Sequence, residues 1–256
     1  MNTNIPRIVV INLQTSIDRR QAMSAHLQEL GLTPTFFDAI DGRKLTEEVV
    51  AAVYDHERAK ATHWGELTRG EIGCALSHRG VWENLIASGD TGWLVLEDDA
   101  VLVPDVPSWL GQLPGVVRDG DVVPFVYTNQ MPYWFKRQKL GERWLVYANQ
   151  GFYRATAYYV TPLAAQRLLR ASTPLWFPID FWYGTPGYKG VTPVRSIWPA
   201  AVTARDEDIK SSTIGVRQAL EPKQSDSKHK GWLRQQISFA RRYVKNRFFL
   251  RPVRME

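Results

Sequence analysis

Three adjacent carboxylates, Glu97, Asp98 and Asp99, interrupt an otherwise apolar stretch of the sequence. Apolar residues at 93–96 and 101–103 flank them, so their backbone must lie close to a buried sheet. Neighbouring ionised carboxylates repel one another and are costly to desolvate, and a bound cation offsets both effects. Oxygen ligands with no His or Cys near them in the sequence select Mg²⁺ or Mn²⁺. We therefore expect Glu97 and Asp99, whose side chains should point to the same side, to hold such an ion.

The position of this acidic triplet indicates what the ion would serve. In open α/β sheets, ligands bind beyond the carboxyl ends of the strands, and the triplet directly follows a predicted strand. Mg²⁺ and Mn²⁺ keep part of their coordination shell for phosphate oxygens, so an acid-x-acid pair is typical of a nucleotide diphosphate site. Two other interpretations stay open. The triplet can be a solvated acidic turn between two strands, and phosphatases and nucleases also use paired acids.

The elements around the triplet begin with a predicted β-α-β arrangement. Residues 8–13 form a continuous apolar run, typical of a strand buried on both faces in a parallel sheet. A helix follows, which Ser16 or Asp18 can cap and Gly31 ends. A second strand is expected over 35–40. Further helices are predicted over 47–60, 71–85 and 162–171, and strands over 93–96, 101–103, 122–127, 144–147 and 157–160.

Composition and charge divide the chain into a body and a tail. Apolar residues make up 44% and charged residues 23%, as in soluble globular enzymes. Residues 209–256 carry twelve Lys/Arg and three Asp/Glu, a net charge of +9, whereas the remainder carries 20 basic and 23 acidic residues. We expect a main domain over 1–208, a polar linker over 209–230 and a basic amphipathic helix over 231–256. Residues 172–199, rich in Pro, Gly and aromatic residues, are expected to be irregular around a pocket.

The sequence also predicts where the protein resides. Its single cysteine, Cys74, excludes an internal disulfide, and a reducing compartment is the simplest location. No basic leader precedes a long apolar region, and no window holds the eighteen or more apolar residues that a membrane span requires. We therefore expect a cytoplasmic protein that does not cross a bilayer.

Four motifs, in this order, resemble glycosyltransferase family 25, which contains lipooligosaccharide galactosyltransferases and collagen galactosyltransferases. The resemblance extends over about residues 5–214, and its most specific part is the stretch from Glu71 to His78 followed by the acidic triplet. The motifs are Ile8-Val9-Val10-Ile11-Asn12-Leu13 with Asp18-Arg19-Arg20, Phe37-Asp38-Ala39-Ile40-Asp41-Gly42, Leu67-Thr68-Arg69-Gly70-Glu71-Ile72-Gly73-Cys74-Ala75-Leu76-Ser77-His78, and Leu96-Glu97-Asp98-Asp99.

The resemblance implies a fold and a reaction. The expected fold is α/β: a single Rossmann-like domain of the GT-A type with a mixed, mainly parallel central sheet. The expected reaction is the inverting, Mn²⁺- or Mg²⁺-dependent transfer of a hexose, with galactose the expected sugar, from a UDP-sugar to a lipooligosaccharide or other surface-glycan acceptor. Residues 131–147 match nothing in the family, so the acceptor stays open.

Several residues are candidates for binding the donor. Arg19 or Arg20 can reach the diphosphate through charge-assisted hydrogen bonds, or can simply be solvated in the first turn of the helix. Asp41 can bind a ribose hydroxyl or belong to an ordinary Asp-Gly turn. By the resemblance, Asp99 is the principal metal ligand, and Asp98 either lines the donor sugar or turns into the fold. The resemblance also places Asn12, Glu71, Ser77 and His78 at the donor, although a lone helical His is often structural.

Asp180 is our candidate for the general base. It lies in Trp176-Phe177-Pro178-Ile179-Asp180-Phe181-Trp182-Tyr183, whose apolar rings should raise its pKa and can stack on an acceptor sugar. Asp180 can alternatively cap a short helix that begins at Phe181. Asp206 and Asp208 are rival candidates for the base or for a metal contact.

Two other functions use the same features. A Mg²⁺-dependent phosphotransferase or phosphodiesterase would use the same acids, and would require further acids or histidines near the metal. A non-enzymatic protein would bind a membrane surface or nucleic acid through its basic tail. We favour the transferase with no nucleic-acid partner.

The C-terminal residues predict peripheral binding to the cytoplasmic face of the inner membrane. An apolar stripe at helical spacing is flanked by basic residues, and each basic residue near an anionic surface contributes about 1 kcal/mol. The alternative is that this stripe packs on the catalytic domain. The stripe consists of Leu233, Ile237, Ala240, Val244 and Phe248.

Deleting residues 231–256 should release the protein from anionic liposomes and lower activity on a lipid-linked acceptor, while activity on a short soluble acceptor is retained. Liposome co-sedimentation at low salt measures the binding. If the full-length protein ignores anionic liposomes, or the truncated protein is insoluble, the stripe belongs to the core.

Overall fold

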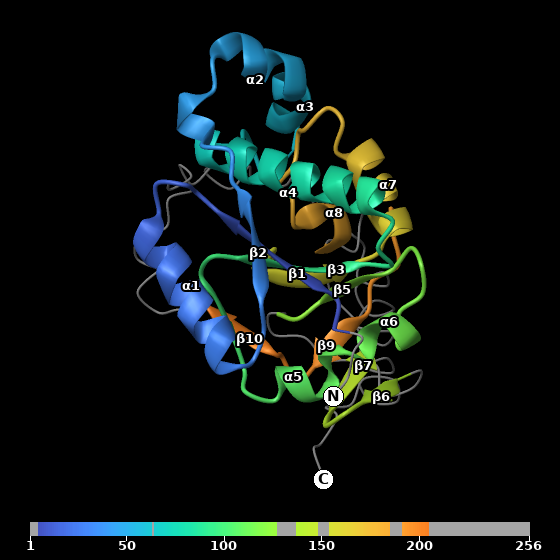
Figure 1. Ribbon diagram of the computed structural model, residues 1–256. Coiled ribbons are helices and arrows are strands. Elements are labelled where there is room, and N and C mark those ends of the chain that lie inside the picture. Colours follow the sequence, from blue (N-terminus) through green and yellow to red (C-terminus); the bar gives the residue numbers. More distant parts are fainter. Residues whose placement is uncertain (1–4, 63, 127–136, 148–153, 185–190, 205–256) are drawn as a thin grey trace, which may run out of the picture.

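The computed structural model describes residues 5–62, 64–126, 137–147, 154–184 and 191–204. At its centre is a five-stranded sheet in the order β2-β1-β3-β8-β5 (Figure 1). β1 pairs in parallel with both β2 and β3, whereas β8 runs antiparallel to its neighbours β3 and β5. The mixed, mainly parallel α/β sheet expected from the sequence is therefore confirmed. These strands are β1 (Arg7–Asn12), β2 (Pro34–Asp38), β3 (Trp93–Glu97), β5 (Val122–Pro124) and β8 (Ala157–Val160).

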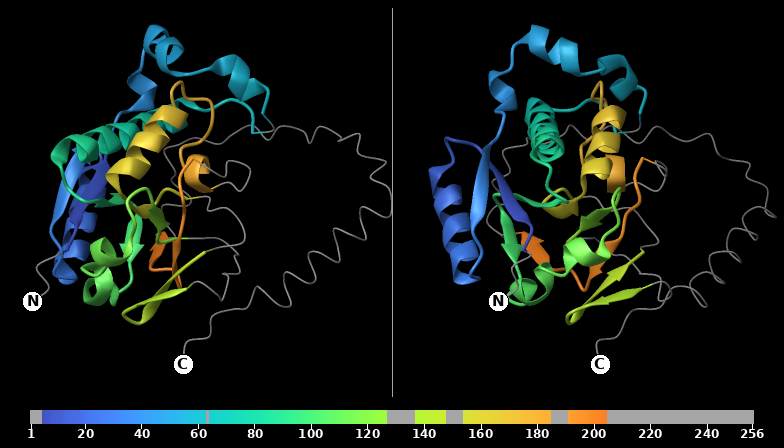
Figure 2. Two further views of the ribbon diagram at one scale, coloured as in Figure 1. Left: turned by 90° about the vertical axis from the view of Figure 1, so that its right-hand side faces the viewer. Right: turned by 45° about the vertical axis from the view of Figure 1, so that its right-hand side comes forward.

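Helices cover both faces of this sheet (Figures 1 and 2). On one face α4 packs against α7, with α8 beside them and α2 and α3 farther from the sheet. On the other face lie α1, α5 and α6. The helices are α1 (Ile17–Glu29), α2 (Glu47–Val53), α3 (His56–Lys60), α4 (Arg69–Ser88), α5 (Val106–Leu110), α6 (Leu113–Val116), α7 (Pro162–Ala171), α8 (Phe181–Gly184) and the 3₁₀ helix η1 (Gly42–Lys44).

The two faces explain why the central strands are apolar without alternation. In β1, Val9 and Ile11 join the core beneath α4 and α7, whereas Ile8 and Val10 join the core beside α1 and α5. A strand sends successive side chains to opposite faces, so a strand covered on both faces must be apolar at every position.

Two small sheets complete the described fold. β4 (Ala100–Leu102) pairs antiparallel with β10 (Val202–Ala204). β7 (Arg143–Val146) pairs with both β6 (Gln138–Leu140) and β9 (Ser196–Trp198). Arg143 secures β7, since it forms an ion pair with Asp105 and donates to the carbonyls of Pro199 and Ala200.

The structure corrects three details of the sequence-based expectations. The single helix predicted over 47–60 is wrong: it is divided into α2 and α3, because Tyr54 bridges to Leu175 and Asp55 caps a new helix by accepting from the Arg58 amide. The predicted irregular stretch over 172–199 contains α8 and β9. Ser16 is the N-cap residue of α1, but its side chain makes no capping hydrogen bond.

Some expectations fall on residues that the structure does not describe. The linker over 209–230, the amphipathic helix over 231–256, and Asp206 and Asp208 all lie outside the described residues. Within the described part of the chain, no helix is both long and apolar enough to span a bilayer.

Two glycines fix the position of α4 relative to the end of β2. A Cβ built on Gly73 would lie 2.5 Å from the Gly42 amide nitrogen and 2.6 Å from the Ile40 carbonyl oxygen. A Cβ on Gly42 would lie 1.7 Å from the Arg69 carbonyl oxygen. Backbone therefore packs directly on backbone, and the Asp41-Gly42 turn serves as a docking surface for α4.

Gly73→Ala should destabilise the protein by about 1–3 kcal/mol, as overpacked cores do. Helix propensity alone predicts the opposite sign, a gain of about 1 kcal/mol. Gly115→Ala in α6 is the matched control, because a Cβ there has no atom within 4 Å. The free energy of unfolding, measured by urea denaturation, checks both variants. A Gly73→Ala protein as stable as wild type would contradict this account of the contact.

Candidate functional site

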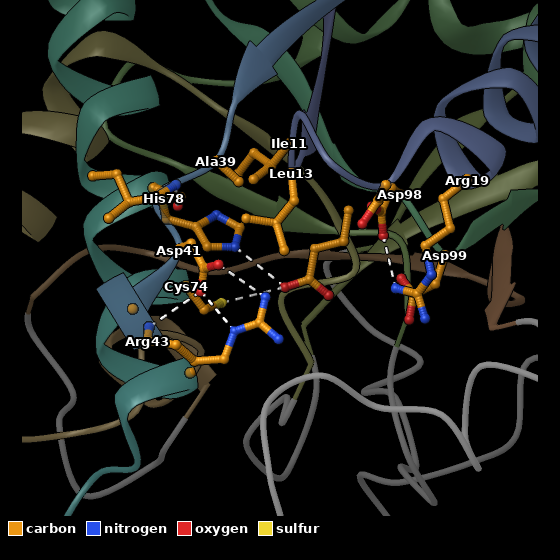
Figure 3. Close-up of a pocket in the computed structure, with 16 residues that line it drawn as sticks. Ile11, Leu13, Arg19, Ala39, Asp41, Arg43, Cys74, His78, Asp98 and Asp99 are labelled. Atoms are coloured by element: carbon orange, nitrogen blue, oxygen red, sulfur yellow. Dashed lines mark hydrogen bonds and ion pairs between the residues drawn. The ribbon is translucent and has the colours of Figure 1, made fainter. Parts of the chain in front are cut away.

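The site is a pocket at the carboxyl ends of β1, β2 and β3, facing the first half of α4 (Figure 3). Parallel strands place their carboxyl ends at the same edge of a sheet, so segments distant in the sequence meet there. Of the residues predicted for the site, seven line the pocket: Arg19, Asp41, Ser77, His78, Glu97, Asp98 and Asp99. The remaining lining residues are Ile11, Leu13, Ser16, Ala39, Ile40, Gly42, Arg43, Gly70 and Cys74.

Asp98 is turned toward β1 and α1. Its Oδ2 accepts from Asn12 Nδ2 at 2.7 Å, and its Oδ1 forms an ion pair with Arg19 Nη1 at 3.2 Å (Figure 3). Burial raises the pKa of Asp98 above its usual value, and the Asn12 and Arg19 contacts oppose that rise. Asp98 thus orients Arg19 at the pocket wall and serves the fold as well as the site. Asn12 is the last residue of β1 and is not among the residues that line the pocket. Its Oδ1 is buried and has no hydrogen-bond partner among the described residues.

Glu97 instead points toward α4, where it ends a chain of hydrogen bonds. Trp82 Nε1 donates to Tyr158 Oη at 2.9 Å, Tyr158 Oη lies 2.8 Å from His78 Nδ1, and His78 Nε2 lies 3.3 Å from Glu97 Oε1. An indole N–H can only donate, so the hydroxyl proton of Tyr158 is free to bond His78 Nδ1. His78 then carries its proton on Nε2 and donates it to Glu97. This arrangement pairs the polar groups of Trp82, Tyr158 and His78 with one another and with Glu97.

Cys74 joins Glu97 on the same side. Its Sγ lies 3.7 Å from Glu97 Oε1. Burial raises the pKa of the Cys74 thiol well above its usual value, and the charges of Glu97 and Asp180 raise it further. The expectation that only oxygen ligands surround the triplet is therefore wrong for Glu97. α4 brings both residue types to Glu97, although they precede it by about twenty residues in the chain.

Arg43 is a pocket residue that the sequence reasoning missed. Its Nε and Nη2 bind the two carboxylate oxygens of Asp41 at 2.7 and 2.9 Å (Figure 3). The same bonds hold the pKa of Asp41 below its usual value. The pair places a guanidinium at the pocket opposite Arg19. A basic residue directly after the Asp-Gly turn was the available signal.

Three predicted donor-binding residues have structural partners here. Ser77 Oγ donates to the Gly73 carbonyl at 2.7 Å and accepts from the Ile40 amide at 2.8 Å, so it ties α4 to the loop after β2. Glu71 forms the capping box of α4 with Thr68. Arg20 pairs with Asp38 and lies over the Phe36 ring, and neither Glu71 nor Arg20 lines the pocket.

Asp180 lies just before α8 and is half-buried. Its charge contributes to the raised pKa values of Cys74 and Tyr183, and it is not among the residues that line the pocket. Because α8 begins at Phe181, a capping role and a catalytic role both stay open. The neighbouring rings are not a platform for a sugar, as expected from the sequence, because they are at most 7% exposed and form core: Trp176, Phe177, Phe181, Trp182 and Tyr183.

Tyr158→Phe should lower the free energy of unfolding by about 1–3 kcal/mol for each buried group it leaves unpaired, here Trp82 Nε1 and His78 Nδ1. Tyr159→Phe is the control, since this neighbour is equally inaccessible but its hydroxyl bonds only Thr91 among the groups identified. Urea denaturation of both proteins measures the difference. A loss in Tyr158→Phe no greater than in Tyr159→Phe would show that the hydrogen-bond chain contributes little.

Comparison with known proteins supports a family assignment. Residues 5–114, which include the whole pocket lining, match the model of "Glycosyltransferase family 25 (LPS biosynthesis protein)". A "Glycosyltransferase 25 family member" of Aedes aegypti is 30% identical over 185 residues, covering 69% of this chain and 30% of that protein. "Putative glycosyltransferase R655" of Acanthamoeba polyphaga mimivirus is 39% identical over 102 residues, covering 39% of this chain and 30% of that protein.

The same comparison shows that membership does not guarantee activity. The "Inactive glycosyltransferase 25 family member 3" of Homo sapiens is 30% identical over 190 residues, covering 68% of this chain and 30% of that protein. The chain spans about 30% of the length of these curated relatives.

Among solved structures, the chain aligns with a putative glucose-1-phosphate thymidylyltransferase from Bacillus anthracis in complex with sucrose. The TM-score is 0.39 and the sequence identity 11%, and the alignment covers 83% of this chain and 98% of that one. On the sequence matches, the chain belongs to glycosyltransferase family 25.

Proposed function

We propose that this chain is a divalent-metal-dependent glycosyltransferase that moves a hexose, galactose by our expectation, from a UDP-sugar to a surface-glycan acceptor such as lipooligosaccharide. The observation that carries the proposal is the composition of the pocket. Three carboxylates, Glu97, Asp98 and Asp99, share it with the guanidinium groups of Arg19 and Arg43. A nucleotide diphosphate and its metal need this combination of anionic and cationic groups.

The residues present fit a hard divalent ion. Three carboxylates line one pocket, and carboxylate oxygens are the ligands that Mg²⁺ and Mn²⁺ prefer. Asp99 would be the principal ligand, with Glu97 contributing the oxygen that does not face His78. Bound there, Mn²⁺ or Mg²⁺ would neutralise charge on the diphosphate as UDP departs.

The chain's own residues would perform the remaining tasks. Arg19, held by Asp98, and Arg43, held by Asp41, would bind phosphate oxygens from two sides of the pocket. The acceptor hydroxyl would attack the anomeric carbon as the bond from that carbon to the UDP oxygen breaks, which inverts the configuration. Asp180 would accept the hydroxyl proton. We further propose, from the sequence of residues 231–256 alone, that the enzyme works at the cytoplasmic face of a membrane that carries its acceptor.

Asp99→Asn and Asp180→Asn should fail in different ways. The Asp99→Asn side chain keeps nearly the same shape but loses the carboxylate that would bind the metal ion. Mn²⁺-dependent UDP binding and transfer should therefore both be lost. The second removes a base, so turnover should fall by roughly two to four orders of magnitude while donor affinity stays near wild type. Calorimetric UDP binding with and without Mn²⁺, and transfer from radiolabelled UDP-galactose, UDP-glucose and UDP-N-acetylglucosamine, measure both effects.

Glu57→Gln is the matched control, because this carboxylate is 87% exposed on α3 and should leave both measurements unchanged. Full activity without added metal would refute the role of Asp99. Collapse of UDP affinity in Asp180→Asn would make Asp180 a donor-binding residue. A wild-type protein that neither binds UDP nor turns over any of the three sugars would refute the proposed function itself.

A further inference from the structure

Cys74, His78 and Glu97 form a compact group of three possible metal ligands at the α4 side of the pocket. Their ligand atoms all lie within 4.8 Å of one another. His78 Nε2 is 3.3 Å and Cys74 Sγ 3.7 Å from Glu97 Oε1. Tetrahedral Zn²⁺ with ordinary bond lengths holds its N, S and O ligands about 3.3–3.6 Å apart. Two of the three separations therefore already approach those of a zinc site.

The backbone positions these ligands rigidly. Cys74 and His78 are four residues apart on α4, so their side chains leave the same face of the helix one above the other. Gly73, adjacent to Cys74, packs directly on the backbone of Gly42 and fixes this turn of α4. Glu97 ends β3 and meets both side chains.

A second layer of residues orients the histidine. His78 is fully buried, and Tyr158 Oη holds its Nδ1 at 2.8 Å, which directs Nε2 at the group. Metal-bound histidines commonly have such a partner on the nitrogen that does not bind the metal. Tyr158 Oη has two lone pairs, so it can accept from both Trp82 and an Nδ1–H of His78.

The electrostatics of the group favour a cation. The Glu97 carboxylate lies beside the buried Cys74 thiol, with Sγ 3.7 Å from Oε1, and its negative charge attracts a cation. A divalent ion would be bound by the thiolate, because metal coordination deprotonates a thiol outright. A thiolate with an imidazole selects the Zn²⁺ class over Mg²⁺ or Mn²⁺.

We propose that Cys74, His78 and Glu97, the last through its Oε1, bind a Zn²⁺-class ion at a site distinct from the hard-ion site at Asp99. The two sites would share the Glu97 carboxylate, each using one of its oxygens. On binding, the Cys74 thiol releases its proton to solvent, and His78 binds through Nε2 while its proton moves to Nδ1. The Tyr158 hydroxyl then turns its own hydrogen away from His78 and accepts the hydrogen bond from Nδ1–H. Three protein ligands leave the fourth position open toward the pocket, which all three residues line. This site goes beyond the proposed transferase function and does not depend on it.

Cobalt titration of the metal-free full-length protein, without nucleotide, tests the proposal. Co²⁺ bound by a thiolate gives a sulfur-to-cobalt charge-transfer band and intense tetrahedral d–d bands. The chain has one cysteine, so any such charge-transfer band must come from Cys74. We expect this charge-transfer band to saturate with one thiolate-bound ion and to be lost on addition of Zn²⁺ but not of Mg²⁺. Absence of the band in wild-type protein that is folded by circular dichroism would overturn the proposal.

Variants show which residues hold the ion. Cys74→Ser, with Cys74→Ala as a second variant if the first misfolds, should lose the charge-transfer band. Tyr158→Phe should retain the band but weaken Co²⁺ affinity by about 10–100-fold, as second-layer substitutions do. His56→Gln is the matched control, because His56 forms an exposed pair with Glu66 at 3.3 Å and should change nothing. Loss of the band in His56→Gln, or its persistence without Cys74, would refute the site.

Asp99→Asn separates this proposal from the transferase. It should keep the cobalt spectrum, because Asp99 is not among the three ligands, while losing Mn²⁺-dependent UDP binding. A cobalt spectrum in a protein that never binds UDP would uphold the zinc-class site and reject the transferase. Loss of the spectrum in folded Asp99→Asn would show that one ion serves both sets of residues and would overturn the separate site.

Discussion

The backbone contact between Gly42 and Gly73 is the constraint on which the site depends. It allows α4 to approach the turn after β2 more closely than any side chain would permit. Ser77 reinforces the same approach by joining Gly73 and Ile40 through its hydroxyl. Because α4 is fixed in this way, Cys74 and His78 reach Glu97 at the end of β3. The turn that carries Asp41 and Arg43 is held on this same side of the pocket, across from Arg19 and Asp98 (Figure 3).

The side chains of the acidic triplet point in different directions where β3 ends. Glu97 points to α4, whereas Asp98 points to Asn12 and Arg19. Glu97 and Asp98 acquire different partners, so the repulsion between them is offset in different ways: an imidazole and a thiol beside Glu97, and an amide and a guanidinium beside Asp98. Asp99 lines the pocket with them. Two neighbouring acids, Glu97 and Asp98, therefore occupy chemically distinct positions.

Burial decides which candidate groups face a ligand and which serve the fold. The aromatic segment around Asp180 packs beneath α4 and α7 with its rings inaccessible, so it stabilises the wall of the site and offers no stacking surface. The buried chain from Trp82 through Tyr158 to His78 extends that wall to Glu97. Polar groups in such a chain are held in place because leaving any of them unpaired is costly.

The sequence by itself determined the elements whose pattern is local or periodic. The apolar run at 8–13 predicted a doubly buried strand, helical periodicity predicted most of α4, and the apolar flanks of the triplet placed it at a strand end. Those features follow from neighbouring residues, so no tertiary information was required. The C-terminal helix is also a local prediction, and it lies outside the described residues.

Only the tertiary structure decided which side chains meet. The approach of Cys74 and His78 to Glu97, the pairing of Arg43 with Asp41 at the pocket, and the displacement of Arg20 to Asp38 all depend on how α4, η1 and α1 pack on the sheet. The break between α2 and α3 depends on a bridge to Leu175, about 120 residues farther along the chain. Residue spacing along one element predicts which face a side chain occupies, but the partner on the facing element is set by packing between elements, which spacing does not encode.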